Sequence, residues 1–484
     1  MIIMAGFDFG TTTSSAVFAR AKVVKNGITG VMEYGAPDIF FAAEPRYTPY
    51  LGDRIDESAL ASYIDAWLAT ANISPQDASA GGAIVTGLAA QKENAGAIAA
   101  LIRARIGDAM IATANDPSLE SWLAFMGSAR ELSRELSDQA IINLDIGGGT
   151  TNLALGMNGE VRSTGCLFIG ARHVQLIPGT YRIESLSPYA QHLFSYLKLA
   201  KSSGDTLSKP EVDRIVDFYL AVIRRALVGK SSEFNDCEAL HEQVPFSLPP
   251  DLFNPSHQAA VTITVSGGVG ELVYRALAGE SPAGVTPFGD LGWDLALGLI
   301  EDEWISPSLK KHVSKNMGRA TAFGLALHNT EVSGTTVFLP DQTILPLRDL
   351  PVLGRISPDT DAASIIKLLE LAAKSSHGSA IQIDGRLSGK IADEIDGKLR
   401  TAEDLQRFSA VFATALRNSG YPQNKTLVLL INGNVGKTLG SLITCWGRDP
   451  FQLVVIDEVS LRTANFVNLG KMTHQIIPVS CYGM

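Results

Sequence analysis

The sequence predicts an α/β protein with two similar lobes followed by a smaller C-terminal α/β domain. Two short apolar runs, at residues 1–7 and 140–144, are typical of buried strands. Each run leads into an aspartate, one further residue, a glycine and then hydroxyl side chains, at residues 8–15 and 145–151. Elsewhere, strand-like and helix-like stretches alternate, as they do in α/β folds. A tight Asp/Gly turn at a strand end explains either loop alone. Two such turns at comparable places indicate two lobes closing on one ligand.

The residues of these two loops suit a phosphate chain with a metal ion. Glycine lets the backbone approach a ligand closely, and a concave set of N–H groups attracts anions. A carboxylate next to phosphate needs a cation between them, and Mg²⁺ prefers carboxylate, water and phosphate oxygens. We therefore expect Asp8 and Asp145 to hold Mg²⁺, largely through waters. The predicted phosphate-binding residues are Gly10, Thr11, Thr12, Thr13, Gly147, Gly148, Gly149, Thr150 and Thr151.

The first lobe is predicted at residues 1–139. After the first loop, strands are expected at 15–20 and 31–34, with a turn at 25–27. A helix over 56–71 has Leu60, Ile64, Trp67 and Leu68 on one face. A strand at 83–87, a helix at 94–106, a strand at 110–112 and a helix opening at 119–125 complete the alternation.

The second lobe is predicted at residues 140–332, with a helical insertion at about 185–235. Strands at 153–155 and 161–167 flank Asn158-Gly159, a strong hairpin signal. The strand at 261–265 runs into Gly267 and Gly268 and then a helix. These glycines would let the backbone approach a flat ligand, so Gly267, Gly268 and Glu271 are candidates for the adenosine side of a nucleotide site. A plain strand-to-helix turn explains the pattern equally well.

The C-terminal domain is predicted at residues 333–484. Strands are expected at 335–339, 380–383, 427–431 and 454–456, and helices at 363–373 and 403–418. Residues 431–438 resemble a phosphate-binding P-loop, but Ile431 occupies the place of the first required glycine. A strand, a turn and a helix that begins near Lys437 is the better interpretation.

Length and composition exclude several classes of protein. The 484 residues are too many for one core. The net charge of −10 argues against a general nucleic-acid surface. The four cysteines form no C-x-x-C pair, as expected in a reducing cytosol. No apolar run approaches the roughly 20 residues that span a bilayer. We expect a cytoplasmic protein without membrane or nucleic-acid partners.

Two loops of this kind with a later strand-Gly-Gly-helix resemble the actin/Hsp70/sugar-kinase superfamily of ATPases over residues 1–330. That resemblance implies two lobes of RNase H type with ATP and Mg²⁺ between them. Nearly the whole chain resembles the EutA family, the reactivating factors of ethanolamine ammonia-lyase. The motifs that carry this resemblance are residues 7–13, 85–87, 92–95, 112–114, 119–121, 143–152, 169–173, 266–271, 288–292, 319–322 and 331–336.

The family resemblance implies a chaperone-like function in ethanolamine utilisation. Such a factor is expected to use ATP and Mg²⁺ to release damaged cobalamin from adenosylcobalamin-dependent ethanolamine ammonia-lyase, so that intact cofactor can enter. We expect slow Mg²⁺-dependent ATP hydrolysis, with Asp8, Asp145 and Glu120 as the catalytic candidates. Glu120 would position the attacking water, although a solvated carboxylate at a helix start is the simpler interpretation. His173 is expected to be structural or at the surface.

Other functions remain open at this point. A small-molecule kinase or a hydantoinase-type ATP-dependent hydrolase could use the same fold, although we identify no catalytic aspartate facing a substrate pocket. A filament-forming protein of the actin type is a third alternative. The sequence leaves open whether the chain forms a homodimer and whether it associates with a bacterial microcompartment.

Overall fold

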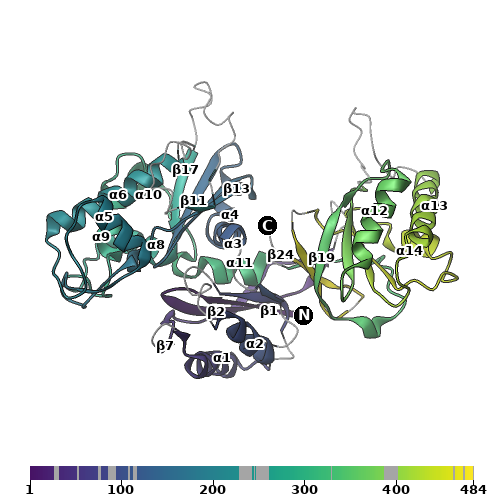
Figure 1. Ribbon diagram of the computed structural model, residues 1–484, viewed down its shortest axis with the longest axis horizontal. Coiled ribbons are helices and arrows are strands. Elements are labelled where there is room, and N and C mark those ends of the chain that lie inside the picture. The colour runs from purple at the N-terminus through teal and green to yellow at the C-terminus, as the bar shows by residue number, and fades with distance from the viewer. Residues whose placement is uncertain are drawn as a thin grey trace.

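The fold comprises two lobes and a C-terminal domain around three principal sheets (Figure 1). The structure is a computed structural model. It describes residues 1–26, 32–51, 54–74, 78–85, 94–106, 110–112, 117–227, 242–244, 246, 261–328, 330–385, 402–461, 464–472 and 475–482. In this part of the chain, no helix combines the length and apolar character needed to cross a membrane.

The first lobe contains a sheet in the order β10-β9-β1-β2-β5, with β6 also paired to β2. β1 pairs antiparallel with β2 and parallel with β9, and β9 pairs parallel with β10. This connectivity is the RNase H-like arrangement implied by the superfamily resemblance. The strands are β1 (Ile2–Phe9), β2 (Thr13–Ala21), β5 (Asp38–Ala42), β6 (Arg46–Tyr47), β9 (Ala78–Val85) and β10 (Met110–Ala112), with β3 (Val23–Lys25), β4 (Met32–Tyr34), β7 (Tyr50–Leu51) and β8 (Arg54–Ile55) in smaller pairs.

Two helices cover one face of this sheet, α1 (Glu57–Ala71) and α2 (Ala95–Ile106). The predicted apolar face of α1 is confirmed, because all four of its residues are buried. Asp56 caps α1 by accepting from the N–H groups of Ser58 and Ala59. The predicted positions Gly27, Val31, Thr86 and Gly87 lie outside the described residues. The strand predicted from residue 83 begins at Ala78, and the other predicted elements of this lobe form close to their expected bounds.

The second lobe repeats this arrangement in the sheet order β16-β13-β12-β11-β17. β11 pairs antiparallel with β12 and parallel with β17, as β1 does with β2 and β9. The elements are β11 (Ala140–Ile146), β12 (Thr151–Met157), β13 (Glu160–Leu167), β14 (Val174–Leu176), β15 (Ile183–Leu186), β16 (Glu242–Val244), β17 (Val261–Ser266), α5 (Pro188–Tyr196), α6 (Lys209–Leu227), α8 (Gly267–Leu277), α9 (Gly292–Glu301), α10 (Ser306–Lys311) and the 3₁₀ turns η2 (Ala171–His173) and η6 (Met317–Arg319).

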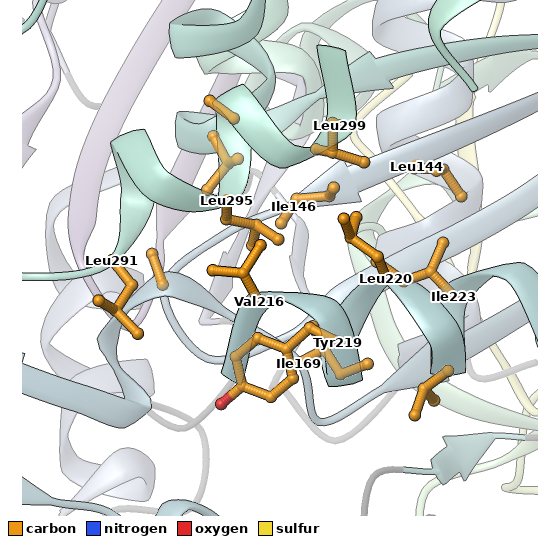
Figure 2. Packing of buried hydrophobic residues seen from close by; sticks show 14 of the residues in the cluster. Leu144, Ile146, Ile169, Val216, Tyr219, Leu220, Ile223, Leu291, Leu295 and Leu299 are labelled. Atoms are coloured by element: carbon orange, nitrogen blue, oxygen red, sulfur yellow. The ribbon is translucent and has the colours of Figure 1, made fainter. Parts of the chain in front are cut away.

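The main core of the second lobe lies between β11 and the helices α6 and α9 (Figure 2). Leu144 and Ile146 of β11 meet Val216 and Leu220 of α6 and Leu295 of α9 in this core. All seven residues of β11 are buried. The strand that ends in the second phosphate loop is therefore held by packing on both faces of its sheet.

Two helices cross between the lobes, α3 (Pro117–Ser128) and α11 (Ala320–His328). α3 packs on β11, β12 and β13, whereas α11 packs on β1, β2 and β9. Their backbones approach closely, since a Cβ on Gly127 would lie 1.9 Å from the carbonyl oxygen of Ala320. A short helix, α4 (Arg130–Glu135), follows α3. The predicted boundaries at 139/140 and 332/333 stay predictions.

The C-terminal domain contains a seven-stranded sheet in the order β18-β24-β23-β19-β20-β21-β22, of which β19 to β22 are parallel. The strand predicted at 335–339 is wrong, because only Phe338 forms an isolated bridge, with Val455. Its side chain instead packs on α14, where a Cβ on Gly440 would lie 2.2 Å from the Phe338 ring. The elements are β18 (Thr330–Val332), β19 (Leu347–Ile356), β20 (Ser379–Ile383), β21 (Leu427–Ile431), β22 (Leu453–Ile456), β23 (Phe466–Leu469), β24 (Pro478–Tyr482), α12 (Ala362–Ala373), α13 (Ala402–Asn418), α14 (Gly436–Ile443) and η7 (Gln342–Ile344).

Candidate nucleotide site between the lobes

Both predicted phosphate loops line one narrow cleft between the lobes. The cleft has a volume of about 60 Å³. Its lining residues are Asp8, Gly10, Thr11, Thr12, Thr13, Glu120, Asp145, Gly147, Gly148, Gly149, Thr150, Gly267, Gly268, Gly318, Ala320 and Thr321. The structure therefore brings together all three catalytic candidates and most of the predicted phosphate-binding residues.

The two loops have the same backbone geometry. In the first, the N–H of Gly10 donates to the carbonyl oxygen of Thr13 over 2.9 Å. In the second, the N–H of Gly147 donates to the carbonyl oxygen of Thr150, also over 2.9 Å. Asp8 and Asp145 lie two residues before these glycines, near the ends of the central strands β1 and β11. The similarity seen in the sequence therefore extends to the shape of the turns.

The loops touch each other at Thr12 and Gly148. A Cβ on Gly148 would lie 1.8 Å from Thr12 Oγ1 and 3.3 Å from Arg172 Cδ, so only glycine fits there. Thr12 Oγ1 is buried at this contact without a hydrogen-bond partner. Buried hydroxyls are normally hydrogen-bonded, so an orphaned one at a phosphate loop fits a site that gains a polar ligand.

A buried chain of hydrogen bonds holds Asp145. The Ser266 hydroxyl donates to Asp145 Oδ1 over 2.5 Å. Asn143 Nδ2 donates to Ser266 Oγ over 2.9 Å, and the Thr264 hydroxyl donates to Asn143 Oδ1 over 2.9 Å. Burial raises the pKa of Asp145 to about 6, and the bond from Ser266 opposes this rise. A nearby cation would offset the cost of ionising this buried carboxyl.

Glu120 is buried in the cleft and belongs to the first turn of α3. Glu120 does lie at a helix start, but the interpretation of a solvated carboxylate is wrong, because the residue is only 8% exposed. The first residues of α8 and α11 also line the cleft. Helix N-termini carry partial positive charge, so the cleft favours an anion.

The adenosine candidates divide between two neighbouring cavities. Gly267 and Gly268 line the cleft, whereas Glu271 lines a cavity of about 850 Å³ beside it, and Gly318 lines both. Gly267 has φ +79°, and a Cβ there would lie 2.5 Å from the carbonyl oxygen of Ile146. The turn into α8 thus requires glycine at Gly267.

Thr151 is the one predicted phosphate ligand that lies outside the cleft lining. Its hydroxyl donates to the carbonyl oxygen of Ile169 over 2.8 Å, and the residue is fully buried. It starts β12, where the sheet turns its side chain away from the cleft. This placement gives no support to a phosphate contact from Thr151.

Sequence reasoning missed Gly318, Ala320 and Thr321 as cleft residues. Gly318 lies in η6, and Ala320 and Thr321 begin α11, almost 200 residues beyond α3 in the chain. The family resemblance of residues 319–322 drew attention to Ala320 and Thr321 but not to Gly318. Their place depends on the crossing of α11 with α3, which no local pattern predicts.

His173 is structural, as expected. The ring is fully buried, with Nε2 2.9 Å from the carbonyl oxygen of Gly149 and Nδ1 2.8 Å from Ser187 Oγ. A carbonyl only accepts, so Nε2 carries the proton and Nδ1 accepts from Ser187. Burial lowers the pKa of His173 to about 4, so the ring is neutral at physiological pH.

The P-loop-like stretch forms a strand, a turn and a helix, as the sequence analysis favoured. β21 ends at Ile431 and α14 begins at Gly436. The buried Asp457 carboxylate accepts from the Thr336 hydroxyl and lies beside Gly436, where an added Cβ would be 3.1 Å from Asp457 Cβ. A carboxylate thus occupies the helix start that a P-loop offers to phosphate.

Comparison with known proteins identifies the family. The family described as "Ethanolamine utilisation protein EutA" matches residues 1–482. The chain belongs to the EutA family. Among relatives of this EutA family member, the ethanolamine ammonia-lyase reactivase EutA of Salmonella typhimurium LT2 is 27% identical over 99% of this chain and 97% of its own. The protein of the same name from Escherichia coli K12 is 26% identical over the same shares.

Solved structures similar to this EutA family member are more distant. The ethanolamine utilization protein EutJ of Carboxydothermus hydrogenoformans is 14% identical with a TM-score of 0.31, over 68% of this chain and 90% of that one. Component A of the (R)-2-hydroxyglutaryl-CoA dehydratase of Acidaminococcus fermentans is 14% identical with a TM-score of 0.30, over 68% and 97%. A Ppx/GppA phosphatase of Aquifex aeolicus is 15% identical with a TM-score of 0.33, over 58% and 73%.

Proposed function

We propose that this chain is an ATP-dependent reactivating factor for adenosylcobalamin-dependent ethanolamine ammonia-lyase. The observation that carries the proposal is the pairing of two phosphate loops and two carboxylates in one cleft, in a chain of the EutA family. Two relatives bear the name of a reactivase of this lyase. The paired loops and carboxylates of the cleft support the use of a nucleotide by such a factor.

The donors of the cleft fit a phosphate chain, and the neighbouring cavity fits a nucleoside. Ligand pockets usually measure roughly 300–1,000 Å³. The cavity of about 850 Å³ beside Glu271 lies in this range, whereas the cleft of about 60 Å³ does not. ATP would therefore place its base and ribose beyond Gly318 and its phosphates between the loops, and the lobes would move apart to admit them.

Asp8 and Asp145 are the residues that would hold Mg²⁺. Two carboxylates leave the other positions of an octahedral ion to waters and phosphate oxygens, which is how proteins usually bind it with nucleotides. When bound, Mg²⁺ supplies positive charge against the charge that develops on the phosphate oxygens. Among the described residues, no three His, Cys, Asp or Glu side chains form a cluster that could hold a metal ion alone.

Glu120 would orient the attacking water and receive its proton. The water oxygen forms a bond to the γ-phosphorus as the bond between that phosphorus and the β,γ-bridging oxygen breaks, giving ADP and inorganic phosphate. The loop N–H groups and the hydroxyls of Thr11, Thr12 and Thr13 would stabilise the charge on the phosphates. Slow turnover of this kind would suit a factor that uses ATP hydrolysis to time a conformational change.

The crossing helices offer a route from the cleft to the lyase. α3 is packed on the second lobe and α11 on the first, and the first turn of each lines the cleft. A change in the distance between the lobes would therefore move the helices relative to each other. We propose that this movement, acting on the lyase, releases damaged cobalamin so that intact cofactor can bind.

Two experiments test this proposal. The first measures ATP and ADP binding with and without Mg²⁺ for the native chain, Asp8→Ala, Asp145→Ala and the exposed control Asp213→Ala. The proposal expects metal-dependent binding that both cleft variants lose and the control keeps.

The second experiment adds the chain to cobalamin-inactivated lyase, with ATP or without nucleotide, and measures recovered deamination. Equal recovery without nucleotide would refute the ATP dependence, and ATP turnover only with an added metabolite would favour a metabolic enzyme.

A further inference from the structure

A short segment of the first lobe holds three consecutive carbonyl groups of the first phosphate loop. The Thr48 hydroxyl donates to the carbonyl oxygen of Gly10 over 2.6 Å. The Tyr50 hydroxyl donates to the carbonyl oxygen of Thr11 over 3.0 Å. The N–H of Thr48 donates to the carbonyl oxygen of Thr12 over 2.9 Å. We call residues 47–50 the first backing segment.

The second lobe uses a different segment for the same purpose. The N–H groups of Ala171 and Arg172 donate to the carbonyl oxygens of Gly147 and Gly148 over 3.1 Å and 2.7 Å. His173 Nε2 donates to the carbonyl oxygen of Gly149 over 2.9 Å. We call residues 171–173 the second backing segment. Neither backing segment lines the cleft.

These bonds determine where the loop N–H groups point. In a trans peptide unit, the C=O group and the following N–H group point in opposite directions. Carbonyls directed at the backing segments therefore turn the N–H groups of residues 11–13 and 148–150 toward the cleft. Successive N–H groups on one side of a turn form a concave site for an anion.

We propose that Thr48, Tyr50 and His173 are positioning residues for phosphate binding, which act by holding the loop carbonyls away from the ligand. The proposal rests on the proposed function, since it concerns the phosphates of the same nucleotide. None of the three side chains touches the cleft. Each acts through the backbone of a loop.

The two backing segments also contact each other across the lobes. The Arg172 guanidinium lies 5.7 Å from the centre of the Tyr47 ring, within reach of a cation–π interaction. Tyr47 precedes Thr48, and the N–H of Arg172 holds the carbonyl of Gly148. When the lobes are close, the contact between Tyr47 and Arg172 joins the two backing segments, and both loops are hydrogen-bonded to these joined segments.

The side chains suit this positioning role. Thr48 is buried, and it also forms a 2.9 Å hydrogen bond with Ser14, whose hydroxyl donates because that of Thr48 is already committed to Gly10. His173 is fixed from its other side by Ser187, which also caps α5 by accepting from the N–H of Ala190. Thr48 and His173 are each hydrogen-bonded both to a loop and to a second side chain, so we expect them to keep their positions when no ligand is bound.

The test measures the affinity of ATP, ADP and adenosine for Tyr50→Phe, Thr48→Val and His173→Leu by calorimetry, with Mg²⁺. Tyr50→Phe and Thr48→Val each remove one hydroxyl and keep the shape. We expect affinity for ATP and ADP to fall about three- to ten-fold, the size of one lost hydrogen bond, and affinity for adenosine to change less than about two-fold. His173→Gln, which keeps a donor, should recover much of what His173→Leu loses.

Tyr63→Phe is the matched control. Tyr63 lies on α1 in the same lobe, packs against Trp67 and Arg46, and belongs to neither backing segment. Its replacement should leave the affinities for all three ligands unchanged. The melting temperature of each variant shows whether a change in affinity follows from unfolding.

The outcomes separate this inference from the proposed function. If the native chain binds no ATP, the proposed function fails first. If the native chain binds ATP and Tyr50→Phe and Thr48→Val bind it equally well, the positioning role is overturned and the proposed function stands. Equal losses for ATP and adenosine would also overturn it, because they would show a general structural effect.

Discussion

Thr12 and Gly148 meet across the cleft so closely that a Cβ on Gly148 would lie 1.8 Å from Thr12 Oγ1. These residues belong to different lobes, and each lies in the middle of a phosphate loop. The absence of a side chain at Gly148 therefore sets how closely the lobes approach.

Gly148→Ala should prevent the lobes from closing fully. The added methyl group meets Thr12 Oγ1 and the Arg172 side chain, so the lobes separate unless the Thr12 side chain rotates away. Because the lobes would also have to move apart to admit the phosphates, we expect the affinity for Mg²⁺-ATP, measured by calorimetry, to be kept or raised, with the fold retained. Gly354→Ala, in β19 of the C-terminal domain, is the steric control, because its nearest neighbour would be Leu368 Cδ1 at 3.4 Å. A large loss of affinity in Gly148→Ala but not in the control would show that binding needs the close contact between Thr12 and Gly148.

Asp145→Asn should stabilise the metal-free protein at neutral pH. Because burial raises the pKa of Asp145 from 3.8 to about 6, its contribution to stability is fully present below pH 3.8 and is lost as the pH rises through 6. The difference corresponds to at most about 3 kcal/mol. The variant should therefore melt at a higher temperature than the native chain at pH 8 and at a similar one near pH 4. Asp213→Asn, at an exposed position, should show no such pH-dependent difference.

Ser266→Ala should make Mg²⁺-dependent binding more sensitive to acid. The Ser266 hydroxyl lowers the pKa of Asp145, so its removal leaves a carboxyl that takes up a proton at higher pH. We expect the pH below which Mg²⁺-ATP affinity declines to rise, in a titration between pH 5 and 8. Thr264→Val, two steps farther along the hydrogen-bond chain, should move this pH less. Identical profiles for the native chain and Ser266→Ala would contradict the role of this bond.

Glu120→Gln should separate binding from hydrolysis. The amide fits the same buried place in the cleft but cannot take the proton of the attacking water. General-base catalysis contributes roughly 10²–10⁴-fold, so single-turnover hydrolysis should slow by about 10²-fold or more while ATP affinity changes little. Hydrolysis at the native rate would remove Glu120 from the mechanism.

Lys437→Ala should leave nucleotide binding unchanged. Lys437 is exposed, and the buried Asp457 carboxylate already lies beside the start of its helix. Affinity for Mg²⁺-ATP within two-fold of the native value is the expected result of calorimetry. A large loss would mean that the P-loop-like stretch binds phosphate after all.

Local sequence signals predicted much of this fold. The alternation of strands and helices, the apolar face of α1 and the hairpin at Asn158-Gly159 follow from short-range periodicity and turn chemistry, whereas the RNase H-like topology of the lobes was implied by the superfamily resemblance. The strand expected at 335–339 did not form, because only Phe338 bridges to the sheet and its half-buried side chain packs on α14. β-branched and aromatic residues favour any half-buried extended segment. Their pattern alone therefore could not distinguish a strand paired in a sheet from an extended segment packed on a helix.

The sequence by itself determined the two turns that we propose bind phosphate, because an aspartate, glycines and threonines directly after a buried strand specify the turn and its donors locally. Only the tertiary structure decided that Thr12 would meet Gly148, that Glu120 would be buried, that Thr321 would line the cleft and that Tyr50 and His173 would support the loops. Each of these depends on packing between distant segments, as in the bond from Tyr50 to Thr11, 39 residues away. Such contacts form only after the sheets and the crossing helices assemble. They join residues far apart in the sequence, so no repeating pattern of residues predicts them.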